Sequence, residues 1–118
     1  MHASLETLSV EVDLCASGWE RIVDKNPPID IIARDIIFGE GPVWDARGKQ
    51  LFFTDIIGDT IWSWKPGEGQ RVVLTPSVKA NGTCLDLEYR LVVERLATRC
   101  WLIAPALKAY ILIFPHIL

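Results

Sequence analysis

The feature that most constrains the fold of this sequence is an internal repeat with a spacing of about 40 residues. One copy begins at Gly41 and the other at Gly82. After the glycine come, in the same order, an apolar residue joined to an aspartate, an apolar triplet, a Trp-containing triplet and a proline. These segments are Trp44-Asp45, Leu51–Phe53, Trp62–Trp64 and Pro66 in the first copy, and Leu85-Asp86, Leu91–Val93, Trp101–Ile103 and Pro105 in the second. Repeats of this length are typical of stacked or radially arranged β units.

Each copy is predicted to form four short antiparallel strands, because runs of β-branched and aromatic residues alternate with turn residues such as Gly58-Asp59 and Pro66–Gly69. The expected strands are Pro42–Trp44, Gln50–Asp55, Thr60–Trp64 and Gln70–Leu74, then Gly82–Leu85, Arg90–Glu94, Arg99–Ile103 and Lys108–Ile113. Four-stranded units of this kind are the blades of a β-propeller. The predicted fold class is therefore all-β, a β-propeller of which this chain has room for about two blades.

The organisation predicted along the chain has three parts. Residues 1–28 are an N-terminal extension and linker, in which Asn26–Pro28 is the linker because proline removes backbone donors. Residues 29–113 form the partial propeller, with blades at about 41–75 and 81–113, and residues 114–118 are an apolar tail. The β-branched segment Ile29–Ile37 is expected to be a further strand, and a helix is the competing interpretation.

Charge and cysteine content exclude several classes of function. With 12 Lys and Arg against 15 Asp and Glu, interspersed along the chain, the sequence lacks the basic surface of a nucleic-acid binder. Three cysteines without a CxxC spacing argue against a disulfide framework or a thiolate zinc site, and the N-terminus lacks the pattern of an export signal. We therefore expect a cytoplasmic protein. A membrane helix at the C-terminus is disfavoured, because Pro105, Lys108 and Pro115 interrupt its apolar stretch.

The stretch "FGEGPVWD", residues 38–45, places one carboxylate between two glycines and before a proline and a tryptophan. The glycines allow a close approach of the backbone, and Pro42 restricts the turn that follows. Taken alone, this motif favours a solvated turn residue at Glu40, and a chemical role for its carboxylate is the alternative.

These segments together resemble a known family. "FGEGPVWD", then "LFFTDIIGDTIWSWKPGEG" and "KANGTCLDLEYRLVVER", resemble the gluconolactonase / senescence-marker-protein / luciferin-regenerating-enzyme family between about Trp19 and Pro105. The resemblance implies a six-bladed β-propeller that binds one divalent metal cation (Ca²⁺, Mg²⁺ or Zn²⁺) in its central channel and hydrolyses sugar lactones. It also implies that Glu40 is a metal ligand. Asn81 matches the family's entry into the second blade, where it contacts substrate or serves as a turn residue.

One position departs from the family pattern. The family carries a turn glycine where this chain has Tyr89, in the run Glu88-Tyr89-Arg90-Leu91. Because tyrosine disfavours positive φ, the hairpin is expected to be strained or altered.

The remaining candidate residues receive structural interpretations. Asp45, Asp55, Asp59 and Asp86 stand at strand ends or turns, where such side chains cap backbone donors. Cys84 and Cys100 fall in predicted strands and are expected to be inert core thiols. His2 and His116 lie at opposite ends of the chain and neither has an i, i+4 histidine partner, so no histidine metal cluster is expected.

Two functions are compatible with this sequence. The first is a gluconolactonase-like, metal-dependent lactone hydrolase that is truncated, so the other metal ligands and the general base would lie in blades absent from this chain. The second is a non-catalytic module whose two-blade units associate into a complete propeller by oligomerisation. The expected partner is a sugar lactone in the first case and further copies of the chain in the second.

Overall fold

The chain forms two units that divide after Arg34, as the computed structural model shows for residues 5–13, 16–96, 100–104 and 110–112. Unit 1 contains strands β1 (Glu6–Ser9) and β2 (Pro28–Ile31), which pair antiparallel, and the short 3₁₀ helix η1 (Trp19–Arg21). None of its described residues is buried. Polar contacts therefore dominate this ribbon, such as the 2.6 Å hydrogen bond that Thr7 Oγ1 donates to Asp30 Oδ1.

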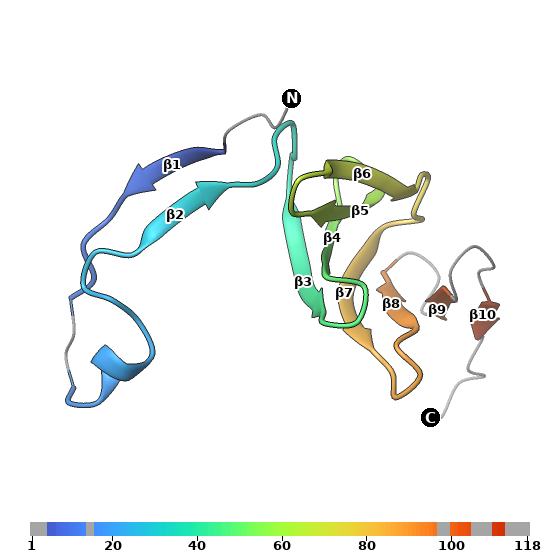
Figure 1. Cartoon of the computed structure of the whole chain (residues 1–118). Coiled ribbons are helices and arrows are strands. Elements are labelled where there is room, and N and C mark those ends of the chain that lie inside the picture. Colours follow the sequence, from blue (N-terminus) through green and yellow to red (C-terminus); the bar gives the residue numbers. More distant parts are fainter. Residues whose placement is uncertain (1–4, 14–15, 97–99, 105–109, 113–118) are drawn as a thin grey trace. The chain divides into compact units, whose positions relative to one another are not determined.

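Unit 2 consists of two four-stranded antiparallel sheets in which neighbouring strands follow one another along the chain (Figure 1). The first sheet contains β3 (Gly39–Asp45), β4 (Gln50–Asp55), β5 (Thr60–Lys65) and β6 (Gly69–Leu74). The second contains β7 (Ala80–Leu85), β8 (Leu91–Arg95), β9 (Cys100–Ala104) and β10 (Tyr110–Leu112). These are the eight strands predicted from the repeat, and the all-β class is confirmed. The predicted apolar tail at 114–118 lies outside the described residues.

The two sheets pack face to face through an apolar core. Ile61 from the first sheet and Ala80, Leu91 and Val93 from the second are buried at its centre. Val43, Phe52, Leu74 and Leu85 pack around them. Because successive side chains of a strand point to opposite faces, this core uses alternate residues of β4 and β8. The result is that β3 and β4 lie against β7.

The prediction for Ile29–Ile37 is wrong in its extent. The strand covers Pro28–Ile31, so Pro28 belongs to β2 and not to a linker, and the helical alternative is wrong as well. Beyond it the backbone leaves the strand conformation, with Asp35 at φ 60°. The amides of Ile37 and Phe38 donate to the carboxylate of Asp55 at 2.9 and 3.0 Å, so a β4 side chain, rather than a neighbouring strand, satisfies this segment.

The hairpin that joins β7 to β8 is altered at Tyr89, as the sequence predicted. Tyr89 has φ 62°, and its amide donates to Asp86 O at 2.9 Å, which is the geometry of a three-residue loop whose last residue is normally glycine. The tyrosine ring lies 4.0 Å from the guanidinium carbon of Arg47, in the β3–β4 turn. A cation–π contact between the two sheets therefore partly offsets the backbone strain.

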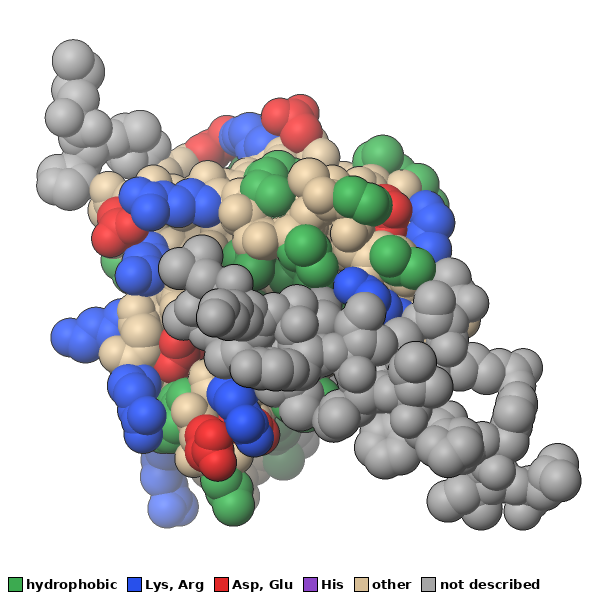
Figure 2. All heavy atoms as spheres, turned by 90° about the vertical axis from the view of Figure 1, so that its right-hand side faces the viewer, with side chains coloured by type: hydrophobic (Ala, Val, Ile, Leu, Met, Phe, Trp, Pro, Cys, Tyr) green, Lys and Arg blue, Asp and Glu red, His purple; other side chains and the backbone are tan. Residues whose placement is uncertain are grey.

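The surface of the described residues carries mixed charges (Figure 2) and an exposed cysteine. On the face that Figure 2 presents, basic side chains lie beside acidic ones, as expected for interspersed charges. Cys84 is exposed, so its predicted place in the core is wrong: it lies on the face of β7 turned away from the first sheet. No helix among the described residues is long and apolar enough to cross a membrane.

Candidate functional site

Glu40 and Asn81 occupy the same position in the two sheets. In the first sheet Gly39 pairs with Asp55, and Glu40 directly follows Gly39. In the second sheet Ala80 pairs with Arg95, and Asn81 directly follows Ala80. Each is followed in turn by a glycine. The structure therefore brings together two residues that the sequence places about 40 positions apart.

Both strands are irregular at this point. The register of β3 against β4 shifts between Glu40 and Val43, and that of β7 against β8 shifts between Ala80 and Thr83. A β-bulge of this kind inserts an extra residue, bends the strand and changes the direction of the side chains beside it. The two candidate residues thus lie at matching bulges, where a strand can present a side chain outside the regular alternation.

The two bulges touch through their backbones, and Gly41 makes this contact sterically acceptable. Gly41 has φ 52°, and a Cβ atom at this position would lie 2.5 Å from Asn81 O, 2.9 Å from Thr83 N and 3.1 Å from the Cα atom of Gly82. All three atoms belong to the backbone and cannot move aside independently. The glycine of the "GEG" motif is thus needed for the approach of β7.

Two threonine hydroxyls connect the strands at the same point. Thr54 Oγ1, on β4, lies 2.7 Å from Asn81 O and 3.2 Å from Glu40 O. Thr83 Oγ1, on β7, donates a hydrogen bond to Gly41 O. Since β3 and β7 belong to different sheets, these hydroxyls provide links that no β-ladder supplies.

The side chain of Glu40 is exposed, and its Oε2 accepts the Gly41 amide at 3.3 Å. The carboxylate of Glu40 and the carboxamide oxygen of Asn81 are hard oxygen donors of the kind that Ca²⁺ and Mg²⁺ prefer. The set is incomplete: among the described residues, no three His, Cys, Asp or Glu side chains form a group that could hold a metal ion. These residues fit a divalent cation in ligand type, and further ligands would have to come from beyond them.

Asp45 and Asp55 have structural roles instead, as the sequence predicted. Asp45 accepts the amides of Arg47 and Gly48 at 3.0 and 2.9 Å. Asp55 accepts the amide of Gly58 at 2.9 Å in addition to those of the segment before β3. Burial by itself raises the pKa of each carboxyl, but the amide donors outweigh it and hold both pKa values below the usual range.

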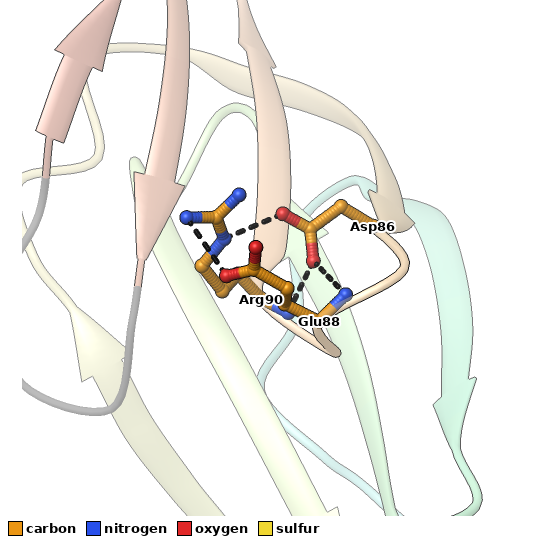
Figure 3. Close-up of polar contacts among 3 residues, drawn as sticks. All are labelled: Asp86, Glu88 and Arg90. Carbon is orange, nitrogen blue, oxygen red and sulfur yellow. Dashed lines mark hydrogen bonds and ion pairs between the residues drawn. The ribbon is translucent and has the colours of Figure 1, made fainter.

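Asp59 and Asp86 also cap backbone donors. Lys79 donates its amide to Asp59 Oδ1 at 2.7 Å, and this bond is the main cause of the lowered pKa of Asp59. Asp86 accepts a hydrogen bond from the amide of Arg90 at 2.9 Å and forms an ion pair with Arg90 Nε at 2.6 Å (Figure 3). These bonds lower the pKa of Asp86. Glu88 pairs with the same guanidinium at 3.2 Å. The carboxylates of Asp59 and Asp86 therefore stabilise turns.

Three residues near the bulges were missed by sequence reasoning. Thr54 and Thr83 link the strands, and Glu94 lies opposite the β7 bulge, where its Oε2 would be 3.7 Å from a Cβ atom on Gly82. The repeat could have indicated that Thr54 and Glu94 hold equivalent positions. Thr54 directly precedes Asp55, the partner of Gly39, and Glu94 directly precedes Arg95, the partner of Ala80. Nothing in the sequence indicates that a hydroxyl of one sheet reaches the carbonyls of the other.

The chain is similar in sequence to a known family of proteins. Residues 38–110 match the family described as "SMP-30/Gluconolactonase/LRE-like region". The chain is 40% identical over 62 residues to a gluconolactonase of Zymomonas mobilis, in an alignment that covers 52% of this chain and 17% of that protein.

Two solved structures have a similar fold. A gluconolactonase from Xanthomonas campestris aligns with a TM-score of 0.70 at 22% identity, over 75% of this chain and 30% of its own. A structural-genomics target described as a "putative gluconolactonase" aligns with a TM-score of 0.57 at 24% identity, over 62% of this chain and 25% of its own. At this identity the likeness shows the fold alone, and this chain spans less than a third of either structure.

Proposed function

Since the chain belongs to the SMP-30/gluconolactonase/LRE-like family, we propose that it serves the metal-dependent hydrolysis of sugar lactones. The observation that carries the proposal is the position of Glu40 and Asn81, at matching bulges of two adjacent strands. Glu40 is the proposed metal ligand, and Asn81 is the proposed contact to the lactone. The general base and the other metal ligands are expected outside the described residues.

The two sheets are, in this proposal, two neighbouring blades of a β-propeller. Each is a four-stranded antiparallel sheet with sequential strand order, and β3 and β7 are the first strands of their sheets. First strands line the central channel of a propeller. This assignment would direct the two bulges, and with them Glu40 and Asn81, toward a common channel.

Each residue of the site would act in a simple way. When bound, a divalent cation polarises the carbonyl of a lactone and lowers the pKa of bound water. Glu40 would supply one anionic oxygen to the cation, with its carboxylate exposed and not buried in an ion pair. The carboxamide of Asn81 could orient a sugar hydroxyl, since it offers both a donor and an acceptor. The close contact of the bulges would hold the two groups at a fixed spacing.

Replacing Glu40 with glutamine tests the proposal. Because the ligand set among the described residues is incomplete, the wild-type chain is expected to bind Ca²⁺ weakly in calorimetry, and any hydrolysis of glucono-lactone should depend on Glu40. We expect Glu40→Gln to reduce Ca²⁺ affinity and kcat/KM by about 100-fold or more, because changes to outer-shell groups alone cost about 10–100-fold. Glu68→Gln is the matched control, since Glu68 is a turn carboxylate of the same unit, paired with Arg71 at 3.0 Å. Equal affinity and rate in Glu40→Gln and the wild type would contradict the assignment.

A second candidate function, self-association without catalysis, is favoured by the outer face of the first sheet. By alternation, Trp44, Phe53 and Val72 point away from the second sheet, and Trp44 and Val72 are 48% and 51% exposed. At the equivalent positions of the second sheet, Leu85 and Val93 pack against the first sheet. The occupant proposed for this face is therefore a sheet of a second copy of the chain, joined head to tail.

Solution mass decides this second candidate. Light scattering is expected to give the mass of a closed oligomer, three copies for six sheets, and Trp44→Glu is expected to give a monomer. Trp19→Glu is the control, because Trp19 is 49% exposed in unit 1. A monomeric wild type would exclude the assembly.

A further inference from the structure

We propose that Thr54 is a positioning residue that sets the spacing between Glu40 and Asn81. The inference rests on the proposed function of these two residues. It adds a group that touches neither metal nor lactone and acts through the backbone of both.

The placement of Thr54 is the first support. Thr54 has no exposed surface, at 0%, and its hydroxyl lies between the carbonyl oxygens of the two candidate residues. The hydroxyl has one proton, and the distance of 2.7 Å to Asn81 O against 3.2 Å to Glu40 O indicates that Asn81 is its acceptor. A single side chain on β4 thus contacts the backbone at both candidate positions, each on a different sheet.

The second support is that the Thr54 hydroxyl joins a strand of the first sheet, β4, to a strand of the second, β7. The two strands belong to separate sheets, so no ladder hydrogen bonds fix their spacing. The bulge glycines, Gly41 and Gly82, have no side chains that could interlock. Thr83 completes the junction from the other direction, by donating to Gly41 O. The two hydroxyls therefore cross-link the bulges in opposite directions.

The chemistry of threonine suits this role. A β-branched side chain has few χ1 rotamers, so its hydroxyl is held in one direction. Valine has nearly the same shape but offers no donor, and would leave Asn81 O without this hydrogen bond in a partly buried place. Serine keeps the donor and loses only the methyl group. In the second sheet, Glu94 precedes the paired arginine as Thr54 precedes Asp55, and its carboxylate has no proton to donate.

Three variants of the full chain test the proposal: Thr54→Val, Thr54→Ser and, as control, Thr60→Val. Thr60 is also a buried threonine of the first sheet, at 7% exposure, but its hydroxyl bonds Gly58 O at 2.9 Å and Thr75 Oγ1 at 3.3 Å, and both partners lie outside β7. The probe is Mn²⁺, followed by its affinity and by paramagnetic broadening of the Glu40 carboxylate and Asn81 carboxamide signals. A second readout, independent of metal, is the NOE between the α-protons of Gly41 and Gly82.

The expected result is that Thr54→Val weakens Mn²⁺ binding about 10-fold, the lower end of the effect of outer-shell changes. It should also lose simultaneous broadening of the two signals and weaken the Gly41–Gly82 NOE. Thr54→Ser is expected to restore all three readouts, and Thr60→Val to leave them unchanged. Mn²⁺ affinity within twofold of wild type in Thr54→Val would overturn the proposal.

Failure of the proposed function gives a different result. If the wild type binds no Mn²⁺, the metal site is wrong, and the NOE alone decides the positioning role. An unchanged NOE in a folded Thr54→Val would then refute it, and a weakened NOE that serine restores would support it.

Discussion

Replacing Gly41 with alanine is expected to destabilise unit 2 by about 3 kcal/mol or more. A left-handed residue with a side chain costs about 1–2 kcal/mol, and forcing extra atoms into a packed site costs about 1–3 kcal/mol. Both costs apply here, because Gly41 has φ 52° and an added Cβ would lie 2.5 Å from Asn81 O. The backbone of β7 must move away to accept it. Chemical denaturation followed by tryptophan fluorescence measures the change.

Gly69→Ala separates the two costs. Gly69 also has positive φ, at 81°, but an added Cβ there has no atom within 4 Å. Its alanine variant should therefore lose only the conformational part, about 1–2 kcal/mol. If Gly41→Ala were no less stable than Gly69→Ala, the close contact between the bulges would be disproved. A larger loss at Gly41, together with weakened Mn²⁺ binding, would connect the contact to the proposed site.

Local patterns allowed most of this fold to be predicted. The strands of both sheets follow from alternation and turn chemistry, which act over a few residues. The capping roles of Asp45 and Asp86 follow for the same reason, since an aspartate at a strand end bonds amides two to four positions ahead. The altered turn at Tyr89 follows from the steric cost of positive φ in a residue with a side chain.

What could not be predicted depends on contacts between distant segments. The segment after Ile31 is rich in β-branched residues, yet it leaves the strand conformation because its amides bond a carboxylate of β4. Cys84 has the apolar neighbours of a core residue, but it lies on the outer face of β7. Which face is buried depends on sheet packing, and alternation alone does not specify it.

The candidate site shows the same division. Glu40 and Asn81 were found from their motifs, and the repeat already implied that they hold related positions. The Thr54 hydroxyl that contacts both backbones has no motif, because threonine in a strand is common. Its significance comes from burial at 0% and from two distances, which exist only in the folded chain.

Asp55→Ala is expected to destabilise unit 2 by about 3 kcal/mol or more, since each buried donor left without a partner costs about 1–3 kcal/mol. Three amides would lose their acceptor, those of Ile37, Phe38 and Gly58, at distances of 2.9, 3.0 and 2.9 Å. Asp55 is only 2% exposed, so water cannot readily replace the carboxylate. The loss should free the segment before β3, which leads directly into Glu40. Denaturation and amide hydrogen exchange at Ile37 and Phe38 measure the two effects.

The pH dependence of this difference provides the decisive control. Burial raises the pKa of Asp55, but the amide donors outweigh it and hold the pKa below its ordinary value of 3.8. A carboxyl whose pKa is lowered in the folded state contributes stability that is complete above the unfolded pKa and is lost as pH falls through the folded pKa. The stability difference between the wild type and Asp55→Ala should therefore stay constant from neutral pH down to about pH 4–5 and shrink only below that. Glu68→Ala, which removes an exposed ion pair with Arg71, should change stability by less than about 1 kcal/mol. A difference that shrinks already near neutral pH would mean that Asp55 is protonated in the folded chain and does not hold these amides as a carboxylate.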